Sequence, residues 1–199
     1  MKLLVATKNE GKFREIGEVL GALPVELVSL KMAGIDDDVE ETAATHEENA
    51  LLKARYFYEK TGLPTLGEDS GIYVDVFPGQ LGVYTRRWEG LAQASDEEWI
   101  RYFLEKMEEV PGDRRGARFV CHAALILPDG SQHHFSGETR GVITHQLEAP
   151  LIPGIPLSSC FKHEGAEAVY AALTPTEKNQ ASHRGKAMRA LAEFLAERI

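Results

Sequence analysis

Apolar residues along the chain occur either in short runs or at helical spacing, and the two patterns alternate. Residues Leu3–Ala6 form a continuous apolar run, which predicts a strand buried on both faces. Helical spacing follows from Phe13 to Leu20, another strand is expected at residues 25–30, and helical spacing returns over residues 42–61. Strands that alternate with helices in this way are typical of an α/β fold.

The middle of the chain predicts a helix followed by a hairpin. Residues 95–110 predict the helix, because Ser95 is a suitable N-cap and acidic residues follow it in the first turn. Pro128-Asp129-Gly130 separates two strand-like runs, residues 117–127 and 131–141, and indicates a tight turn between them. Two antiparallel strands are therefore expected there.

The last quarter of the chain predicts a long loop and a terminal helix. Residues 148–159 carry three prolines and predict a loop long enough to be functional. A strongly amphipathic pattern after Ser182 predicts the C-terminal helix. No internal repeat or linker divides the 199 residues, so residues 1–199 are expected to form a single domain.

Residues 66–75 carry the clearest candidate chemistry. Glu68 and Asp69 are adjacent acids, and neighbouring side chains of an extended segment point to opposite faces. The two acids could share a metal only at a turn, which Gly67 and Gly71 would permit. Carboxylates that hold a hard cation, next to free backbone amides, suit chemistry on a magnesium-bound phosphate. The alternative is an acidic surface turn before a strand.

A second candidate is the polar segment of residues 7–12. It joins a predicted strand to a predicted helix, so helix N-terminal amides would face the strand end and could bind an anion. Lys8 and Lys12 add positive charge, and Thr7 or Asn9 can cap the helix. The segment lacks the glycine spacing of a Walker motif.

Composition narrows the class of protein. A net charge of −9 argues against binding nucleic-acid polymers, although a few lysines in a cleft suffice for a triphosphate. Cys121 and Cys160 form neither a disulfide framework nor a zinc pattern, and are expected to be reduced core residues. The N-terminal apolar run is too short for a signal peptide, and no stretch reaches membrane-spanning length. A soluble cytoplasmic protein is expected.

Several pieces of the chain together resemble the inosine triphosphate pyrophosphatase family, also called dITP/XTP or non-canonical purine pyrophosphatases. The resemblance runs from about residue 2 to the end and rests on motifs that occur in the family's order: Thr7-x-Asn9-x-x-Lys12, Glu41-Thr42, Glu48-Asn49-Ala50, Lys53-Ala54, Asp69-Ser70-Gly71, Val74-Asp75, Gly82-Val83-Tyr84-x-x-Arg87, Lys178 and Ser182-His183-Arg184-Gly185. It implies an elongated mixed β-sheet flanked by helices, with two lobes around a central active-site cleft. It also implies a homodimer.

The resemblance implies roles for the matched residues. The phosphate-binding loop would consist of Thr7, Lys8, Asn9, Glu10, Gly11 and Lys12. The side chains that neutralise the phosphates would be Lys53 and Lys178. Glu41 and Asp69 would hold Mg²⁺, and Asp69 or Glu68 would orient or deprotonate the attacking water. The remaining substrate contacts would come from Ser70 beside the metal and from His183 and Arg184 at the 6-oxo edge of the base.

Two segments depart from the family pattern. The base-binding loop normally reads Gly-Phe-Gly-Tyr-Asp-Pro, but residues 154–159 place Ile155 at the stacking position and Ser158 at the acid. Base–aromatic stacking contributes about 1–3 kcal/mol, so purine affinity is expected to be lower unless Tyr84, Trp88 or Phe161 supplies a replacement stacking surface. The usual Gly-x-Thr-Phe before Glu-Asn-Ala is replaced by Ala43-Ala44-Thr45-His46, so this loop is expected to take another path.

The expected activity is Mg²⁺-dependent hydrolysis of ITP, dITP or XTP to the monophosphate and pyrophosphate. Metal-binding carboxylates and lysines are the groups that such a reaction needs, because it depends on holding phosphate and water in line and on neutralising charge. The altered base loop leaves two alternatives open. One is a pyrophosphatase for a different or modified nucleotide, and the other is a nucleotide-binding sensor with little catalysis.

Overall fold

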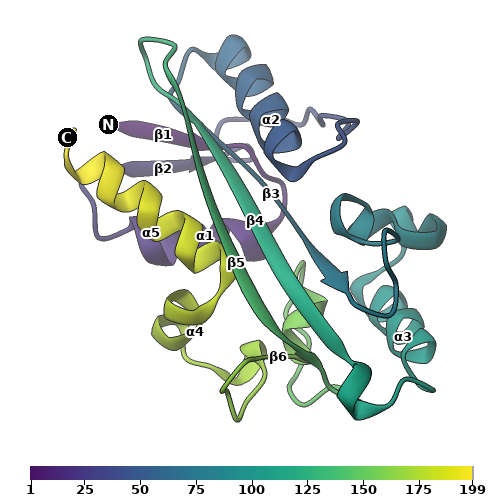
Figure 1. Ribbon diagram of the computed structural model, residues 1–199. Coiled ribbons are helices and arrows are strands. Elements are labelled where there is room, and N and C mark those ends of the chain that lie inside the picture. The colour runs from purple at the N-terminus through teal and green to yellow at the C-terminus, as the bar shows by residue number, and fades with distance from the viewer. Residues whose placement is uncertain (199) are drawn as a thin grey trace.

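The computed structural model describes residues 1–198 and contains a six-stranded mixed sheet (Figure 1). Its strands are β1 (Lys2–Val5), β2 (Glu26–Ser29), β3 (Thr65–Val74), β4 (Gly116–Ile126), β5 (Gln132–Ile143) and β6 (Phe161–His163). They lie in the order β2-β1-β3-β4-β5-β6. β1 runs parallel to both β2 and β3, whereas β4, β5 and β6 are each antiparallel to the preceding strand.

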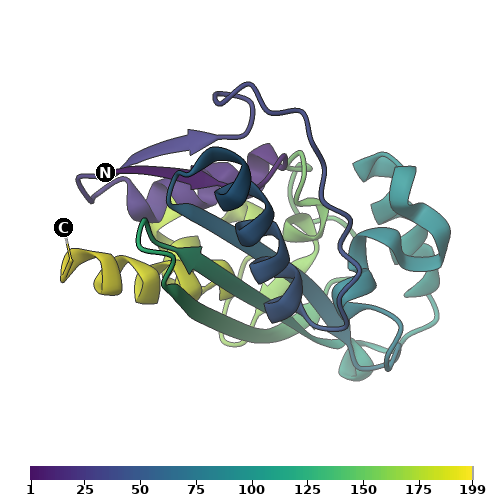
Figure 2. The same cartoon turned by 90° about the horizontal axis from the view of Figure 1, so that it is seen from above.

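Helices cover both faces of this sheet. The α-helices are α1 (Glu10–Leu20), α2 (His46–Thr61), α3 (Asp96–Lys106), α4 (Pro175–Ala181) and α5 (His183–Ala196). Short 3₁₀ segments are η1 (Gly82–Gln93), η2 (Gly112–Arg114), η3 (Pro156–Ser159) and η4 (Tyr170–Ala172). α2 covers one face, α1 and α5 cover the other, and α3 lies with η1 at the far end of the long hairpin (Figures 1 and 2). No helix among the described residues is long and apolar enough to cross a membrane.

The β4–β5 hairpin connects two lobes with separate cores. In the first lobe α1 and α5 pack on the sheet, and their core includes Ile16, Leu191 and Leu195. The core of the second lobe includes Trp88, Trp99, Phe103 and Phe161, contributed by η1, α3 and β6. β4 contributes Cys121, Ala123 and Leu125 to the first core and Ala117 to the second. The predicted long sheet with two lobes is therefore confirmed.

The predicted helix boundaries at residues 42 and 110 were wrong, since α3 ends at Lys106. α2 begins at His46 and not at Thr42, because the Thr45 side chain accepts a hydrogen bond from Glu48 N–H and caps the helix there. β3 begins at Thr65, so the acidic pair lies inside a regular strand and the expected turn at Gly67 is absent. Gly67 has a packing role instead, since a Cβ there would lie 2.1 Å from the Ala50 carbonyl oxygen of α2.

β3 is paired with β1 over a short length only, and this leaves part of its edge open. The register joins Leu4 and Val5 of β1 to Thr65 and Leu66, and Ala6 N–H donates to Leu66 O at 2.8 Å. Backbone groups of alternate residues point to the same edge of a strand. Beyond Leu66, the groups of Glu68 and Ser70 therefore face the space between the lobes.

Candidate functional site

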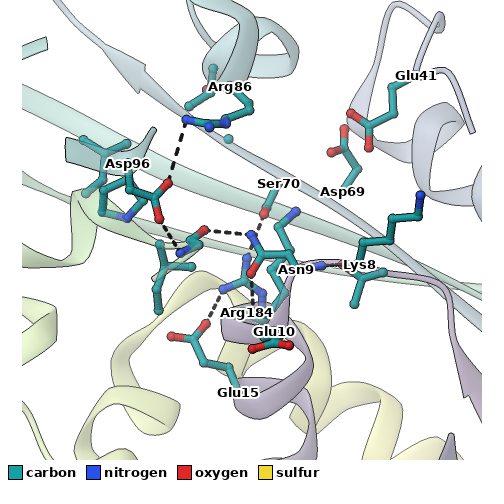
Figure 3. Close-up of a pocket in the computed structure, with 18 of the residues that line it drawn as sticks. Lys8, Asn9, Glu10, Glu15, Glu41, Asp69, Ser70, Arg86, Asp96 and Arg184 are labelled. Carbon is teal, nitrogen blue, oxygen red and sulfur yellow. Dashed lines mark hydrogen bonds and ion pairs between the residues drawn. The ribbon is translucent and has the colours of Figure 1, made fainter. Parts of the chain in front are cut away.

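A cavity of about 1090 Å³ lies at the open edge of β3, between the two lobes. It is lined by the loop before α1, the segment after β2, η1, the start of α3, the loop around Pro153 and the start of α5. Figure 3 shows that side chains from these separate segments point toward one space. The predicted phosphate, metal and base residues are thus brought to a single site.

On the α2 face of the sheet, Asp69 meets a lysine and a second carboxylate. Lys53 Nζ lies 3.7 Å from Asp69 Oδ1 and also forms a short ion pair with Glu41. Glu41 is held in turn by Arg87 of η1, which donates to the Glu41 carbonyl oxygen at 2.9 Å. Lys53 and Asp69 are both buried. Two carboxylates therefore converge on one ammonium group at the cavity wall.

This pair of carboxylates fits a divalent cation of the magnesium type. Among residues 1–198 no group of three or more His, Cys, Asp or Glu side chains is arranged to hold a metal alone. Mg²⁺ is usually held by one or two carboxylates together with substrate phosphates and water. Glu41 and Asp69 supply such a pair, and the Lys53 ammonium between them indicates that their oxygens converge on positive charge.

On the opposite face, Glu68 belongs to a buried ion network and not to the cavity wall. Its side chain is 1% exposed. Its Oε1 accepts from Arg184 Nη2 at 3.1 Å, and its Oε2 pairs with Lys12 Nζ at 2.9 Å. Arg184 also pairs with Glu15 of α1 and donates to Ser70 Oγ at 2.8 Å. The predicted action of Glu68 on water does not match this geometry, because both carboxylate oxygens are paired with cations and Glu68 does not line the cavity.

The protonation states of Glu68 and Asp69 follow from burial and from nearby charges. Burial opposes ionisation of Glu68, but Arg184 and Lys12 hold its pKa well below the usual range. Burial likewise opposes ionisation of Asp69, and the hydrogen bond from His46 together with Lys53 lowers its pKa. Both carboxylates are therefore ionised at neutral pH.

The helix cap predicted within residues 7–12 is confirmed. Asn9 Oδ1 accepts from Lys12 N–H at 2.9 Å, so Asn9 caps α1 as one of the two predicted residues. Lys8 Nζ instead donates to the Asp36 carbonyl oxygen at 2.8 Å, which joins this loop to the acidic segment after β2. Gly11 does not line the cavity, and a Cβ there would lie 2.8 Å from the Pro153 carbonyl oxygen.

The divergent base loop is fixed at Gly154 from two sides. The Gly154 carbonyl oxygen accepts from Asn9 Nδ2 at 2.7 Å, and its N–H donates to Asp96 Oδ2 at 2.6 Å. Ile155 and Ser158 both line the cavity. Lys178 Nζ donates to Ser158 Oγ at 3.2 Å and pairs with Glu15 at 2.5 Å. Ser158 therefore contacts one of the predicted phosphate-neutralising lysines.

Phe119 of β4 is an aromatic lining residue that sequence reasoning missed, and it lies beside His183. Its ring stacks on His183 with centroids 4.6 Å apart and an interplanar angle of 9°. Trp88 and Phe161 are instead buried in the second core, and Tyr84 is 49% exposed, so none of the three expected replacements lines the cavity. The strand alternation of residues 117–127 was the one sequence signal for Phe119.

His183 is held neutral beside this aromatic surface. Burial, followed by the charge of Arg184, lowers the pKa of His183 well below its ordinary value. Its buried Nδ1 has no hydrogen-bond partner. A neutral imidazole carries one donor and one acceptor, so His183 has hydrogen-bonding capacity left for a bound molecule.

Most of the predicted site residues line the cavity. The cavity is lined by Thr7, Lys8, Asn9, Glu10, Lys12, Glu41, Lys53, Asp69, Ser70, Ile155, Ser158, Lys178, His183 and Arg184. Gly11 and Glu68 do not line it. Lining residues that sequence reasoning missed include Glu15, Arg87, Asp96, Phe119 and Tyr170.

Comparison with known proteins agrees with this geometry. A model described as the Ham1 family matches residues 3–194. The chain belongs to the Ham1 family. It is 42% identical over 195 residues to a dITP/XTP pyrophosphatase of Geobacter sulfurreducens, covering 98% of this chain and 96% of that protein. It is 39% identical over 199 residues to a dITP/XTP pyrophosphatase of Streptomyces coelicolor, covering 98% of each.

Solved Ham1 structures have the same fold. A HAM1 protein from Coxiella burnetii is similar with a TM-score of 0.82 and 31% identity over 99% of both chains. A nucleoside-triphosphatase / dITP/XTP pyrophosphatase from Mycobacterium abscessus is similar with a TM-score of 0.70 and 38% identity, covering 98% of this chain and 99% of that one. The predicted family and the mixed α/β Ham1 fold are therefore confirmed.

Proposed function

We propose that this Ham1 protein hydrolyses ITP, dITP and XTP to the nucleoside monophosphate and pyrophosphate. The observation that carries the proposal is that one cavity is lined both by a pair of carboxylates and by stacked rings. Asp69 and Glu41 converge on Lys53, and His183 stacks on Phe119. The similar dITP/XTP pyrophosphatases, aligned over nearly the whole chain, support the same substrate class.

The triphosphate would lie along the N-terminus of α1 and the open edge of β3. Helix N-terminal amides and the backbone N–H groups of β3 are suitable donors for phosphate oxygens. Lys12 and Lys53 lie on either side and would offset the negative charge of the substrate. Lys178, which lies beyond Ser158, would contribute from the base end.

Asp69 is the residue we assign to the attacking water. It is ionised, it lines the cavity, and its Oδ1 faces Lys53. A carboxylate in this position can orient a water molecule and accept a proton from it. Glu68 is assigned a different task, because its ion pairs hold Lys12 and Arg184 in place.

Mg²⁺ would be held by Glu41 and Asp69 together with substrate oxygens. When bound, it would supply charge neutralisation at the phosphates and would make water a better nucleophile. Lys53 would then pair with phosphate oxygens instead of with both carboxylates, since an ammonium on a flexible stem can move to a new partner.

The purine would stack near Phe119, with its 6-oxo edge toward His183 and Arg184. All nitrogens of a guanidinium donate hydrogen bonds and none accepts. It can therefore pair with O6 of hypoxanthine and xanthine, which accepts, but not with the exocyclic amine of adenine, which donates. Phe119 provides the flat surface that Ile155 cannot. Assembly as a homodimer and a cytoplasmic location remain predictions based on the sequence.

The proposal is tested by measuring pyrophosphate release with Mg²⁺ from ITP, XTP, dITP, GTP, dUTP and ATP. Turnover confined to the first three, and lost in Asp69→Asn, is the expected result. Turnover of another nucleotide would keep the hydrolytic assignment and contradict the base assignment. Binding without turnover of any of them would contradict the enzyme assignment and favour a sensor.

A further inference from the structure

His46 lies at the first position of α2, directly against Asp69. It is 4% exposed, although histidine is a polar residue and the family pattern has an apolar phenylalanine there. The departure found in the sequence at residues 43–46 therefore places an imidazole beside the carboxylate assigned to the attacking water.

The contact between His46 and Asp69 is a buried hydrogen bond. His46 Nδ1 lies 2.7 Å from Asp69 Oδ2, and the side chains are 3% and 6% exposed. An ionised carboxylate can only accept, so Nδ1 carries the hydrogen and donates it. Hydrogen bonds to a charged acceptor are shorter and stronger than neutral ones. Asn49 Nδ2, at 3.5 Å from the same oxygen, adds a weaker contact.

The imidazole ring is itself held in place by aromatic neighbours. His122 of β4 stacks on it with centroids 6.3 Å apart and an interplanar angle of 14°. Tyr73 of β3 meets it edge-on at 6.0 Å and 85°. Its Nε2 is buried without a hydrogen-bond partner, so Nδ1 is the only ring nitrogen that forms a polar contact among the described residues.

The contact divides the two oxygens of Asp69 between two tasks. Oδ2 accepts from His46 and faces the interior, whereas Oδ1 lies 3.7 Å from Lys53 Nζ at the cavity. Without the donor on Oδ2, the carboxylate could rotate about its Cβ–Cγ bond, because such terminal torsions are broad. Positioning of this kind affects the rate strongly, since displacement of a reacting group by about 1 Å can cost on the order of 10²-fold.

We propose that His46 is a positioning residue for the reaction, which aims Asp69 Oδ1 into the cavity through a hydrogen bond from Nδ1 to Oδ2. This inference rests on the proposed function, because it assigns Asp69 a task in hydrolysis. His46 does not line the cavity and is not assigned a contact with substrate. The competing explanation is that His46 only fills space, in which case a phenylalanine would serve equally well.

Three substitutions separate the two explanations. His46→Asn can place an amide N–H near the position of Nδ1, His46→Gln places it near Nε2, and His46→Phe keeps an aromatic ring with no donor. With ITP and saturating Mg²⁺, we expect His46→Phe and His46→Gln to lower kcat by about 10- to 100-fold with little change in KM. His46→Asn should retain kcat within about threefold.

Equal kcat in His46→Phe and the wild type would overturn the proposal. Equal losses in His46→Asn and His46→Gln, with both variants folded by circular dichroism, would overturn it as well. If the wild type has no turnover of any nucleotide, the proposed function fails and kinetics cannot address His46.

A second measurement does not depend on activity. Long-range ¹H–¹⁵N correlation spectra of the wild-type protein report which nitrogen of a histidine carries the hydrogen. We expect His46 to be the Nδ1–H tautomer, with its signal shifted in Asp69→Ala. An Nε2–H tautomer in the wild type would contradict the hydrogen bond on which the proposal depends.

Discussion

Glu68 and Asp69 are neighbours in the chain, but the sheet places their side chains among different partners. Asp69 meets Lys53 and His46 on the face covered by α2, and Glu68 meets Arg184 and Lys12 on the face covered by α5. The identical charge of the two residues therefore says little about their tasks. Asp69 lines the cavity, whereas the ion pairs of Glu68 hold its carboxylate away from the cavity.

Glu68→Gln is expected to reduce stability. The change removes a buried negative charge and leaves Arg184 and Lys12 less well compensated, which typically costs about 3–5 kcal/mol. Urea denaturation at pH 7 measures the loss, and Glu197→Gln at an exposed C-terminal position is the matched control with a change within about 0.5 kcal/mol. Unchanged stability together with loss of turnover as complete as in Asp69→Asn would contradict the assignment.

The residues that could be predicted were those with their own local signal. Asn9 was one of the two cap candidates for α1, and its side chain accepts from Lys12 N–H at 2.9 Å. Phe119 and Glu15 could not be found, because their proximity to His183 and Arg184 depends on strand register and helix packing. Contacts between residues distant in the chain leave no pattern in either local sequence.

At the scale of elements, α1 is joined to α5 by charge as well as by apolar packing. Glu15 of α1 forms buried ion pairs with Arg184 of α5 and Lys178 of α4. Burial raises the pKa of Glu15, but the two cations more than offset this and lower it below the ordinary value of 4.5. The junction between these helices therefore depends on ionised carboxylates.

Acid is consequently expected to destabilise this junction. The pKa values of Glu15 and Glu68 are lowered by folding, so the unfolded chain binds more protons as the pH falls below about 4.5. The stability that these groups contribute is complete above that pH and is lost as the pH decreases toward their folded pKa values. Urea midpoints measured from pH 7 to about pH 3 should fall less steeply in Glu15→Gln than in the wild type. Parallel slopes would contradict the prediction.

The hydrogen bonds that Gly154 forms with Asn9 and Asp96 give a prediction about the base loop. Its φ is +81°, and a Cβ would lie 2.4 Å from Asn9 Oδ1, so alanine would be strained and would also displace the cap of α1. Gly154→Ala should raise KM for ITP by about tenfold, because loop and phosphate site are disturbed together. Gly165→Ala is the matched control, since Gly165 has a φ of +79° and open space around its Cβ position. A similar KM in both variants would contradict a role of the Gly154 hydrogen bonds in substrate binding.

Most elements could be predicted because their apolar spacing is regular. The strands predicted at residues 117–127 and 131–141 agree closely with β4 and β5. Here the turn sequence and the alternation of apolar residues both indicated a hairpin. A turn was considered at Glu68 and Asp69, since a glycine and adjacent acids do not look like a strand interior, but both residues lie within β3. Those acids are compatible with a strand because Lys12 and Arg184 on one side and His46 and Lys53 on the other compensate them.

At the scale of the whole molecule, the long hairpin is shared by the two lobes, and we expect them to unfold as one cooperative unit. β4 and β5 pair continuously from Gly116 to Ile126, and the same strands enter both cores. Unfolding of one lobe would remove packing from strands that the other lobe requires. A single transition is therefore expected for residues from both cores.

The two tryptophans allow a direct test of this cooperativity. Trp88 and Trp99 both lie in the second core, so intrinsic fluorescence reports on that lobe, whereas far-UV circular dichroism reports on the whole chain. Leu191→Ala in the first core should lower stability by about 2–5 kcal/mol. Both signals should then move to the same lower midpoint, by about 2–4 °C for each kcal/mol. A fluorescence midpoint that stays in place would indicate independent lobes.

The placement of Asp69 and Arg184 on opposite faces of one sheet also bears on how this enzyme class could change over time. Residues around Asp69 belong to α2 and its preceding segment, while those around Arg184 belong to α1, α4 and α5. Mutations in α1, α4 and α5 can therefore change the surroundings of Arg184 while α2 keeps His46 and Lys53 beside Asp69. The central sheet acts as a partition between two sets of positions that selection can adjust separately, although residues of both sets line one cavity.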